Sequence, residues 1–165
     1  MDYDEMFKQP DYNPAEPDKI KIVQDWIAKH KLKRVLDVDC GRGHYLKRTG
    51  ADGLEPSSYL CEHDLKGWPV TNSTILDFPQ ANYDGLYCMD VLEHLTNIEV
   101  HLDKLKSLAP LALYGIANHS DKWRGIELHV IQQSLYWWDT LLKQHYAKVK
   151  LIQNRGRFFI LECSQ

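Results

Sequence analysis

The chain has 165 residues, of which 44% are hydrophobic and 26% are charged, so it can bury a core as one globular domain. Its net charge of −3 and its pI of about 6.2 exclude the strongly basic balance of a nucleic-acid-binding protein. Its sequence has no run near the ~20 apolar residues that cross a bilayer, and its acidic N-terminus lacks the apolar core of a signal peptide. We therefore expect a cytoplasmic protein with neither a nucleic-acid nor a membrane partner.

In chain order, the first predicted segment covers residues 1–17. Its aromatic and methionine side chains indicate that part of it docks on the rest of the protein. Pro17-Asp18 opens a helix, and a short helix is expected before Gly50. Two later helices follow the capping residues Asn97 and Ser134. Short apolar runs predict strands at 34–39, 53–55, 69–71, 84–90 and 111–117.

The C-terminal part of the chain predicts a hairpin over 149–161, centred on Asn154-Arg155-Gly156. Residues 118–133 are polar and are expected to be irregular. Alternating strands and helices imply a mostly parallel sheet with helices on both faces, to which the hairpin adds an antiparallel strand. The expected fold class is therefore α/β, a single Rossmann-like domain over residues 18–165 that follows an N-terminal tail or lid at 1–17.

The four cysteines are Cys40, Cys61, Cys88 and Cys163, and no two of them form a CxxC pair. Free thiols in a reducing compartment suit this spacing best. The neighbouring Cys61, Glu62 and His63 do not match any usual set of metal ligands, so we expect no metal site.

The strongest functional signal lies where the first strand ends. The run Val35-Leu36-Asp37-Val38 leads into the turn Asp39-Cys40-Gly41-Arg42-Gly43, and the second strand ends on Glu55. Small residues in such a turn let the backbone approach a ligand, and an acid at a strand end can accept hydrogen bonds from a ribose diol. The sequence lacks both the full three-glycine dinucleotide pattern and a GxxxxGK[ST] phosphate loop, so a ligand without phosphates fits better.

At these residues the chain resembles the class I S-adenosylmethionine-dependent methyltransferases, in their small-molecule branch. Residues 35–43 follow the opening motif of that family, with Asp39 in place of its first glycine. Gly53-Leu54-Glu55-Pro56-Ser57 is similar to the segment whose acid binds the ribose. Asp90-Val91-Leu92-Glu93-His94 is the most specific match, and it lies within a fourth-strand segment at 83–95. The resemblance covers roughly residues 20–163.

The resemblance implies that the cofactor is S-adenosylmethionine. It implies these cofactor-binding residues: Asp37, Asp39, Cys40, Gly41, Gly43, Glu55, Pro56, Thr74, Ile75, Leu76, Asp90 and Val91. Two of them depart from the family pattern. Asp39 occupies a position where a positive φ is expected, and its carboxylate should repel the carboxylate of the ligand. Thr74 replaces an acid that often bonds the adenine amino group.

Several residues keep two interpretations. Glu55 is either a ribose ligand or a solvated turn carboxylate, and Asp37 either shapes the loop or contacts the ligand. Glu93 and His94 either serve the site or pair locally as structural residues. His119, and after it His129, is a candidate general base, because imidazole titrates near neutral pH; the alternative is that both are ordinary loop residues.

The sequence thus predicts methyl transfer to a small-molecule acceptor with an oxygen or nitrogen nucleophile. The alternative is a degenerate, non-catalytic module that binds S-adenosylmethionine. Residues 1–17 and 118–133 are expected to close over the acceptor. The identity of the acceptor and the oligomeric state stay open.

Overall fold

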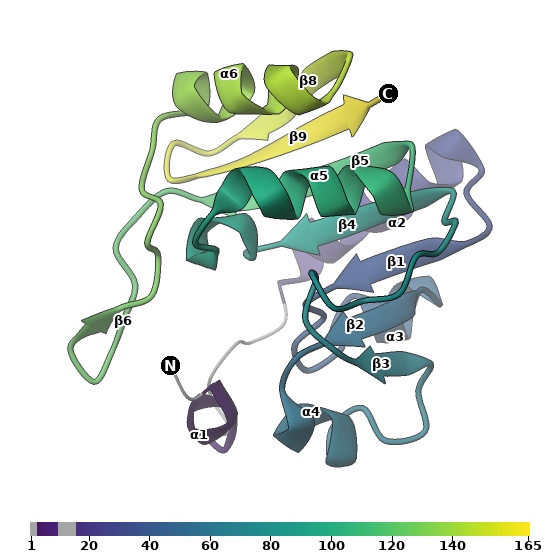
Figure 1. Ribbon diagram of the computed structural model, residues 1–165, viewed down its shortest axis with the longest axis vertical. Coiled ribbons are helices and arrows are strands. Elements are labelled where there is room, and N and C mark those ends of the chain that lie inside the picture. Colours follow the sequence, from purple (N-terminus) through teal and green to yellow (C-terminus); the bar gives the residue numbers. More distant parts are fainter. Residues whose placement is uncertain (1–2, 10–15) are drawn as a thin grey trace. The chain divides into compact units, whose positions relative to one another are not determined.

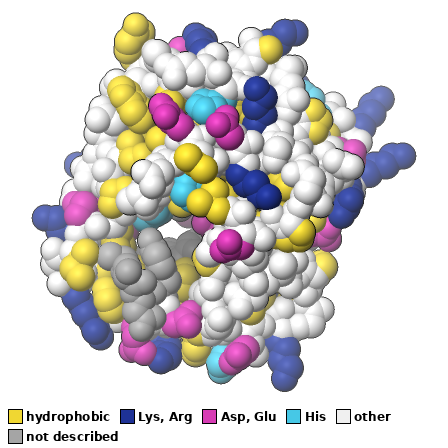
Figure 2. Space-filling model, viewed as in Figure 1, with side chains coloured by type: hydrophobic (Ala, Val, Ile, Leu, Met, Phe, Trp, Pro, Cys, Tyr) yellow, Lys and Arg dark blue, Asp and Glu magenta, His cyan; other side chains and the backbone are white. Residues whose placement is uncertain are grey.

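The computed structural model describes residues 3–9 and 16–165, whose helices and strands are labelled in Figure 1. Its internal contacts divide the chain into two compact units, Met1–Pro79 and Gln80–Gln165. On the face drawn in Figure 2, lysine and arginine side chains are interspersed with aspartate and glutamate side chains. None of the helices in the described part of the chain has the length and apolar character that crossing a membrane requires.

The first unit contains three parallel strands in the order β3-β2-β1. These strands are β1 (Val35–Val38), β2 (Asp52–Glu55) and β3 (Val70–Asn72). Its helices are α1 (Tyr3–Phe7), α2 (Pro17–His30), α3 (Leu46–Thr49) and α4 (Ser58–Glu62). Residues 39–43, which follow β1, are called the glycine loop below. Because the strands are parallel, the glycine loop and Glu55 at the end of β2 lie at the same edge of this sheet.

The local sequence explains why the strands and helices beside this edge form. All four residues of β1 are buried, as a parallel strand covered on both faces requires. Gly53 allows α3 to pack closely on β2, because a Cβ atom there would lie 2.5 Å from the Leu46 side chain and 2.7 Å from that of Val70. Proline at its start and buried Val23 and Trp26 explain why α2 forms.

The second unit contains four strands in the order β4-β5-β9-β8. Strands β4 (Gly85–Met89) and β5 (Leu111–Ala117) are parallel, whereas β9 (Phe158–Ser164) runs antiparallel to both β5 and β8 (Lys148–Asn154). Its helical elements are the 3₁₀ turn η1 (Leu92–His94), α5 (Ile98–Leu108) and α6 (Leu135–His145). The remaining strands, β6 (Lys122–Trp123) and β7 (Ile126–Glu127), form a separate small hairpin.

The predicted fold class is confirmed, with parallel strands, helices between them and a C-terminal antiparallel pair. One expectation is wrong, since residues 118–133 are not irregular throughout. Arg124 and Gly125, at φ 50° and 80°, form the two-residue turn of the β6–β7 hairpin. A second correction concerns Asn97, which precedes α5 as predicted but lies at φ 55° and makes no side-chain cap bond. Ser134 does cap α6, by accepting a hydrogen bond from the Trp137 amide.

Candidate functional site

The glycine loop of the first unit has three residues in the left-handed region, Asp39, Gly41 and Gly43, with φ values of 51°, 53° and 73°. The positive φ expected at Asp39 is therefore present. Hydrogen bonds hold the loop in this shape, from the Cys40 amide to the Leu54 carbonyl (3.0 Å) and from the Gly43 amide to the Cys40 carbonyl (2.9 Å). The loop is thus tied to β2 before any ligand binds.

Glu55 is buried at the end of β2, with 2% of its surface exposed, which excludes the solvated turn carboxylate. One of its oxygens, Oε2, accepts a hydrogen bond from the Gly41 amide at 2.8 Å, and Oε1 accepts one from the Ser57 amide at 2.8 Å. A carboxylate oxygen has capacity for a second donor, so each oxygen can still accept from a ligand hydroxyl. Glu55 therefore joins the glycine loop to the start of α4 and presents a hydrogen-bond acceptor beside both.

Asp39 is half-buried and Glu55 is buried, and the pKa of each carboxyl group is raised. Burial raises the pKa of Asp39 to about 8, and the charge of Glu55 adds to the shift. Burial also raises the pKa of Glu55 to about 7, although its bonds from the Ser57 and Gly41 amides oppose the shift. Within the described residues, Asp39 Oδ1 is buried and has no hydrogen-bond partner. At neutral pH Asp39 is therefore mostly uncharged, so it repels an anionic ligand group less than its residue type indicates.

The other predicted cofactor residues of the first unit differ in exposure. Asp37 and Cys40 are buried, at 2% and 6% exposed, whereas Pro56 is exposed. Burial raises the pKa of the Cys40 thiol well above its usual range, so this thiol is an inert core group.

Thr74 caps the turn that follows β3. Its hydroxyl donates a hydrogen bond to Asp77 Oδ2 at 2.7 Å and accepts one from the Asp77 amide at 3.2 Å. Of the two residues after it, Ile75 is buried at 3% exposed and Leu76 is 45% exposed. In this structure the hydroxyl of Thr74 serves the turn, and Leu76 offers the apolar surface of this segment.

The short helix α1 docks against α4 within the first unit. Asp4 Oδ1 accepts hydrogen bonds from the Ser57 hydroxyl at 2.5 Å and from the Tyr59 amide at 3.3 Å. A carboxylate suits this position because the first amides of a helix lack internal partners. Met6 of α1 is fully buried. Part of the N-terminal segment therefore docks, as the sequence predicts.

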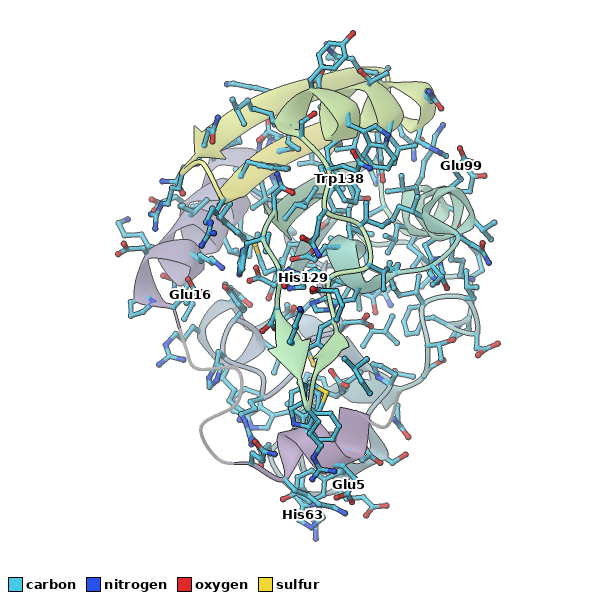
Figure 3. All side chains as sticks on the ribbon, turned by 90° about the vertical axis from the view of Figure 1, so that its left-hand side faces the viewer. Glu5, Glu16, His63, Glu99, His129 and Trp138 are labelled. Atoms are coloured by element: carbon cyan, nitrogen blue, oxygen red, sulfur yellow. The ribbon has the colours of Figure 1, made fainter. Side chains whose placement is uncertain are left out.

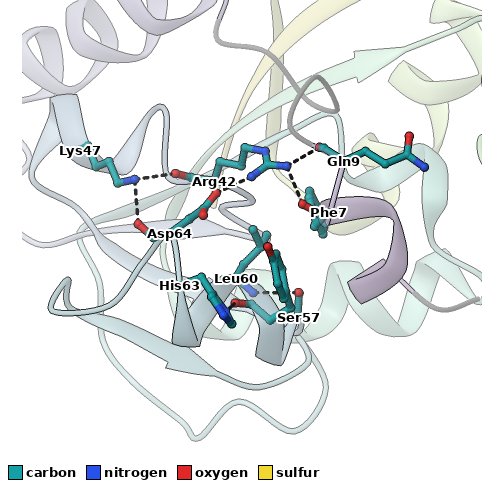
Figure 4. A network of polar contacts seen from close by, with 9 residues as sticks. Phe7, Gln9, Arg42, Lys47, Ser57, Leu60, His63 and Asp64 are labelled. Atoms are coloured by element: carbon teal, nitrogen blue, oxygen red, sulfur yellow. Dashed lines mark hydrogen bonds and ion pairs between the residues drawn. The ribbon is translucent and has the colours of Figure 1, made fainter.

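Arg42 ties the same segment to the glycine loop, as Figure 4 shows. Its Nη2 donates to the carbonyl oxygens of Phe7 and Gln9, each at 2.6 Å, and its Nη1 donates to Asp64 Oδ2 at 2.5 Å. The guanidinium is a rigid fork of donors, so one side chain fixes all three partners. The N-terminal segment is therefore anchored beside the loop that is predicted to hold the cofactor.

In the second unit, Glu93 joins the ends of two strands. It is fully buried, and its Oε1 accepts a hydrogen bond from the amide of Ala117, the last residue of β5, at 2.8 Å. Its backbone carbonyl accepts from the Ile131 amide at 3.0 Å. Asp90 and Val91, both predicted cofactor residues, precede it; Asp90 lies at φ 59° and Val91 is buried. Glu93 follows β4, and it thus connects this part of the chain to the end of β5 and to the segment after the β6–β7 hairpin.

Three histidines gather at this end of the second unit. The ring of His129 lies 4.7 Å from that of His94 and 5.0 Å from that of His119, measured between centroids, and it approaches both at a steep angle. Figure 3 labels His129 beside the small hairpin, and only 4% of its surface is exposed. Burial, and then the charge of His129, lowers the pKa of His94 to about 4, so His94 is neutral at physiological pH. The two predicted bases, His119 and His129, are therefore neighbours.

Glu127 holds the segment that carries these histidines. Its Oε1 accepts hydrogen bonds from the Asp121 amide at 2.9 Å and the His129 amide at 3.2 Å, and its Oε2 accepts from the Ser120 hydroxyl at 2.6 Å. The bond from Ser120, with those from the two amides, lowers the pKa of Glu127 to about 2. The sequence does not predict the role of Glu127, and it favours a structural role for Glu93 and His94. The Glu93-His94 pair directly after a strand is the local signal that points to a functional role.

Comparisons with known proteins bear on the fold. No protein-family profile and no curated protein sequence matches this chain. Among solved structures, the methyltransferase domain of bacterial CtHen1 matches with a TM-score of 0.70 at 14% identity, covering 89% of this chain and 97% of that one. Magnesium protoporphyrin IX methyltransferase (ChlM) from Synechocystis PCC 6803, with bound SAM, matches with a TM-score of 0.66 at 18% identity, covering 90% and 78% of the two chains.

The N-terminal domain of EvdMO1 with SAH bound is a third match, with a TM-score of 0.69 at 9% identity, covering 91% of this chain and 82% of that one. Each match spans most of both chains, so it includes the strands of the first unit and those of the second. The chain therefore has the fold of the class I S-adenosylmethionine-dependent methyltransferases.

Proposed function

We propose that this protein binds S-adenosylmethionine and transfers its methyl group to an oxygen or nitrogen nucleophile of a small-molecule acceptor. The observation that carries the proposal is Glu55, a buried acid at the end of β2 that accepts a hydrogen bond from the Gly41 amide. Such an acid would accept hydrogen bonds from the two ribose hydroxyls of the cofactor. Structural neighbours with bound SAM or SAH support the same cofactor.

The remaining donor contacts are proposed from the same edge of the first unit. Asp39, Cys40, Gly41 and Gly43 would surround the methionine part of the cofactor through the backbone of the glycine loop. Pro56 would continue the ribose side, and Thr74, Ile75 and Leu76 would approach the adenine. Leu76 suits this role because it is 45% exposed beside a turn that Thr74 stabilises. Asp37, buried inside β1, would support the loop or contact the ligand. Asp90 and Val91 after β4 complete the proposed cofactor residues.

The chemical step would be an in-line displacement. The acceptor nucleophile would form a bond to the methyl carbon while the carbon–sulfur bond breaks, and the electron pair of the breaking bond would stay on sulfur to give S-adenosylhomocysteine. Orientation of the two reactants can supply ~7–11 kcal/mol of barrier lowering without any covalent intermediate. The proton of an acceptor hydroxyl or amine would go to His119 or, as the second candidate, to His129.

Residues 1–17 and 118–133 are proposed to cover the bound reactants. The described part of the first segment is already fixed through Asp4 and Arg42, and the second is fixed through Glu127. A cover that excludes water strengthens the electrostatic interactions inside a site.

A non-catalytic module that binds S-adenosylmethionine is the rival function. It needs the glycine loop and Glu55 but makes no use of His94, His119 and His129 of the second unit. An acceptor screen that detects S-adenosylhomocysteine by mass spectrometry separates the two. Product that forms with wild type and decreases in His119→Asn supports transfer. Clear cofactor binding without product from any acceptor would favour the rival.

A further inference from the structure

The second unit brings one carboxylate and two imidazoles close together. Glu93 and His94 follow β4, and His129 follows the β6–β7 hairpin. A ligand atom from each of Glu93, His94 and His129 lies within 4.8 Å of the other two. Ligands that hold a metal at 2.0–2.2 Å lie about 3–4 Å apart, so small side-chain rotations would close the set. Glu93 and His129 are buried, whereas His94 is only partly buried and leaves a side by which an ion can enter.

Hydrogen bonds give both imidazoles the tautomer that a metal requires. The Nδ1 of His94 lies 3.1 Å from the Leu128 carbonyl oxygen, and the Nδ1 of His129 lies 2.6 Å from the His119 carbonyl oxygen. A carbonyl only accepts hydrogen bonds, so each Nδ1 carries the proton and each Nε2 keeps its lone pair when the ring is neutral. Metal-binding histidines characteristically donate their second ring nitrogen to such a carbonyl.

The surroundings hold these donors in place. The Ala117 amide fixes Glu93, and Glu127 fixes the backbone of His129. Nδ1–carbonyl bonds alone do not indicate a site, because His63 and His101 make them to carbonyls four residues earlier in the chain. What distinguishes His94 and His129 is that their carbonyl partners come from distant residues and that their rings converge with a buried carboxylate.

We propose that Glu93, His94 and His129 bind a divalent first-row transition metal ion. Two imidazole nitrogens and one carboxylate oxygen suit Mn²⁺, Fe²⁺, Co²⁺ or Zn²⁺, and three protein ligands leave coordination positions open for an acceptor or water. The sequence shows only the Glu93-His94 pair as a local signal, because the third ligand, His129, lies 35 residues after His94.

This proposal also narrows the acceptor, a step that rests on the proposed function. A metal ion lowers the pKa of a coordinated hydroxyl group, so the acceptor would be an alcohol that binds through its oxygen. With His129 on the metal, His119 remains to take the proton. Its Nδ1 is buried and, within the described residues, has no hydrogen-bond partner. The deprotonated oxygen of the acceptor alcohol would then attack the methyl carbon, and S-adenosylhomocysteine would leave.

Titration of the untagged, chelator-treated full chain with Co²⁺, followed by visible absorption, tests the site. Wild type should bind one Co²⁺ per chain. His94→Asn and His129→Asn keep a side-chain donor near the carbonyl but remove Nε2, and Glu93→Gln keeps an acceptor for the Ala117 amide. Each should lower the affinity by at least about tenfold. His101→Asn is the matched control, since it removes an imidazole with the same kind of carbonyl bond, and it should bind like wild type.

A wild-type protein that gives no Co²⁺ absorption, or three variants that bind like wild type, would overturn the proposal. A variant that fails to fold does not block the test, because Mn²⁺ can be added to wild type alone. Its paramagnetism should broaden the NMR signals of the Ala117 amide and of the His94 and His129 rings; broadening confined to other residues would refute the site.

A calorimetric titration of the same proteins with S-adenosylhomocysteine separates this proposal from the proposed function. If wild type binds S-adenosylhomocysteine but no metal ion, only the metal site is refuted. If wild type binds a metal ion but no S-adenosylhomocysteine, only the cofactor assignment is refuted. An acceptor screen with Mn²⁺ then tests the acceptor class. Methylation of amines and not of alcohols would overturn the alcohol assignment.

Discussion

Replacing Asp39 by asparagine should make the protein more stable at neutral and alkaline pH. Asp39 is an acid whose pKa rises from an ordinary 3.8 to about 8 in the folded state, because its carboxyl group is shielded from water and lies near the charge of Glu55. Between these two values the folded state holds a proton that the unfolded state has released. Stability should therefore be lost as pH rises through this window, the reverse of the trend for a salt-bridged acid.

The magnitude follows from the size of the shift. Each pKa unit corresponds to about 1.36 kcal/mol, so a shift of about four units sets an upper bound of roughly 6 kcal/mol between pH 4 and pH 8. Asparagine removes the titration, has nearly the same shape and tolerates the left-handed φ of 51° at this position. Glu55, whose pKa is raised to about 7, leaves a smaller pH dependence in the variant.

Urea unfolding at pH values from 5 to 9 measures this effect. The free energy of unfolding of wild type should fall across the series, while that of Asp39→Asn should fall much less and exceed wild type at pH 8. Asp25→Asn is the control, because Asp25 is exposed and pairs with Lys21 on the surface of α2, an interaction worth little. Parallel profiles for wild type and Asp39→Asn would refute the burial argument.

Three further predictions concern the cofactor side. Asp39→Gly should tighten S-adenosylhomocysteine binding, more at pH 9 than at pH 7 because Asp39 ionises near pH 8; calorimetry that shows weaker binding or a pH-independent gain would contradict this. Glu55→Ala should weaken that binding by roughly 1.5–3 kcal/mol, the range for hydrogen bonds to a charged group, and an unchanged isotherm would remove Glu55 from the site. A chain lacking Met1 to Asn13 should still bind the cofactor in part but transfer methyl poorly, and full activity on an identified acceptor would show that this segment is not part of the pocket.

The sequence predicts those segments whose backbone conformation is determined by residues adjacent in the chain. Strands β1 and β5 lie where their apolar runs indicate, and the positive φ at Asp39 follows from its place in a glycine-rich turn. The acid that ends β2 is equally local. Such short segments can be predicted from sequence because their own residues determine their backbone geometry.

The parts that were missed depend on residues far apart in the chain. The Ser57 hydroxyl donates a hydrogen bond to Asp4, and the Arg42 guanidinium donates to the carbonyl oxygens of Phe7 and Gln9. No local sequence pattern predicts these contacts. The role of Glu127 was missed for a different reason, since a polar segment of this kind resembles a loop until its carboxylate is seen to accept three hydrogen bonds.

Burial is the other quantity that residue types do not give. The residue type of Asp39 predicts a negative charge, but its environment favours the neutral form at pH 7. The sequence predicts that Thr74 contacts the adenine. In this structure the Thr74 hydroxyl bonds Asp77, and its contact with a ligand stays a prediction.

The most direct test of the proposed function is calorimetric titration of the full chain with S-adenosylhomocysteine at pH 7. We predict saturable binding of one ligand per chain that Glu55→Ala weakens and that the exposed-site variant Asp25→Asn leaves unchanged. Absence of measurable binding to folded wild-type protein, or equal binding by wild type and Glu55→Ala, would contradict the assignment of the glycine loop and Glu55 to the cofactor.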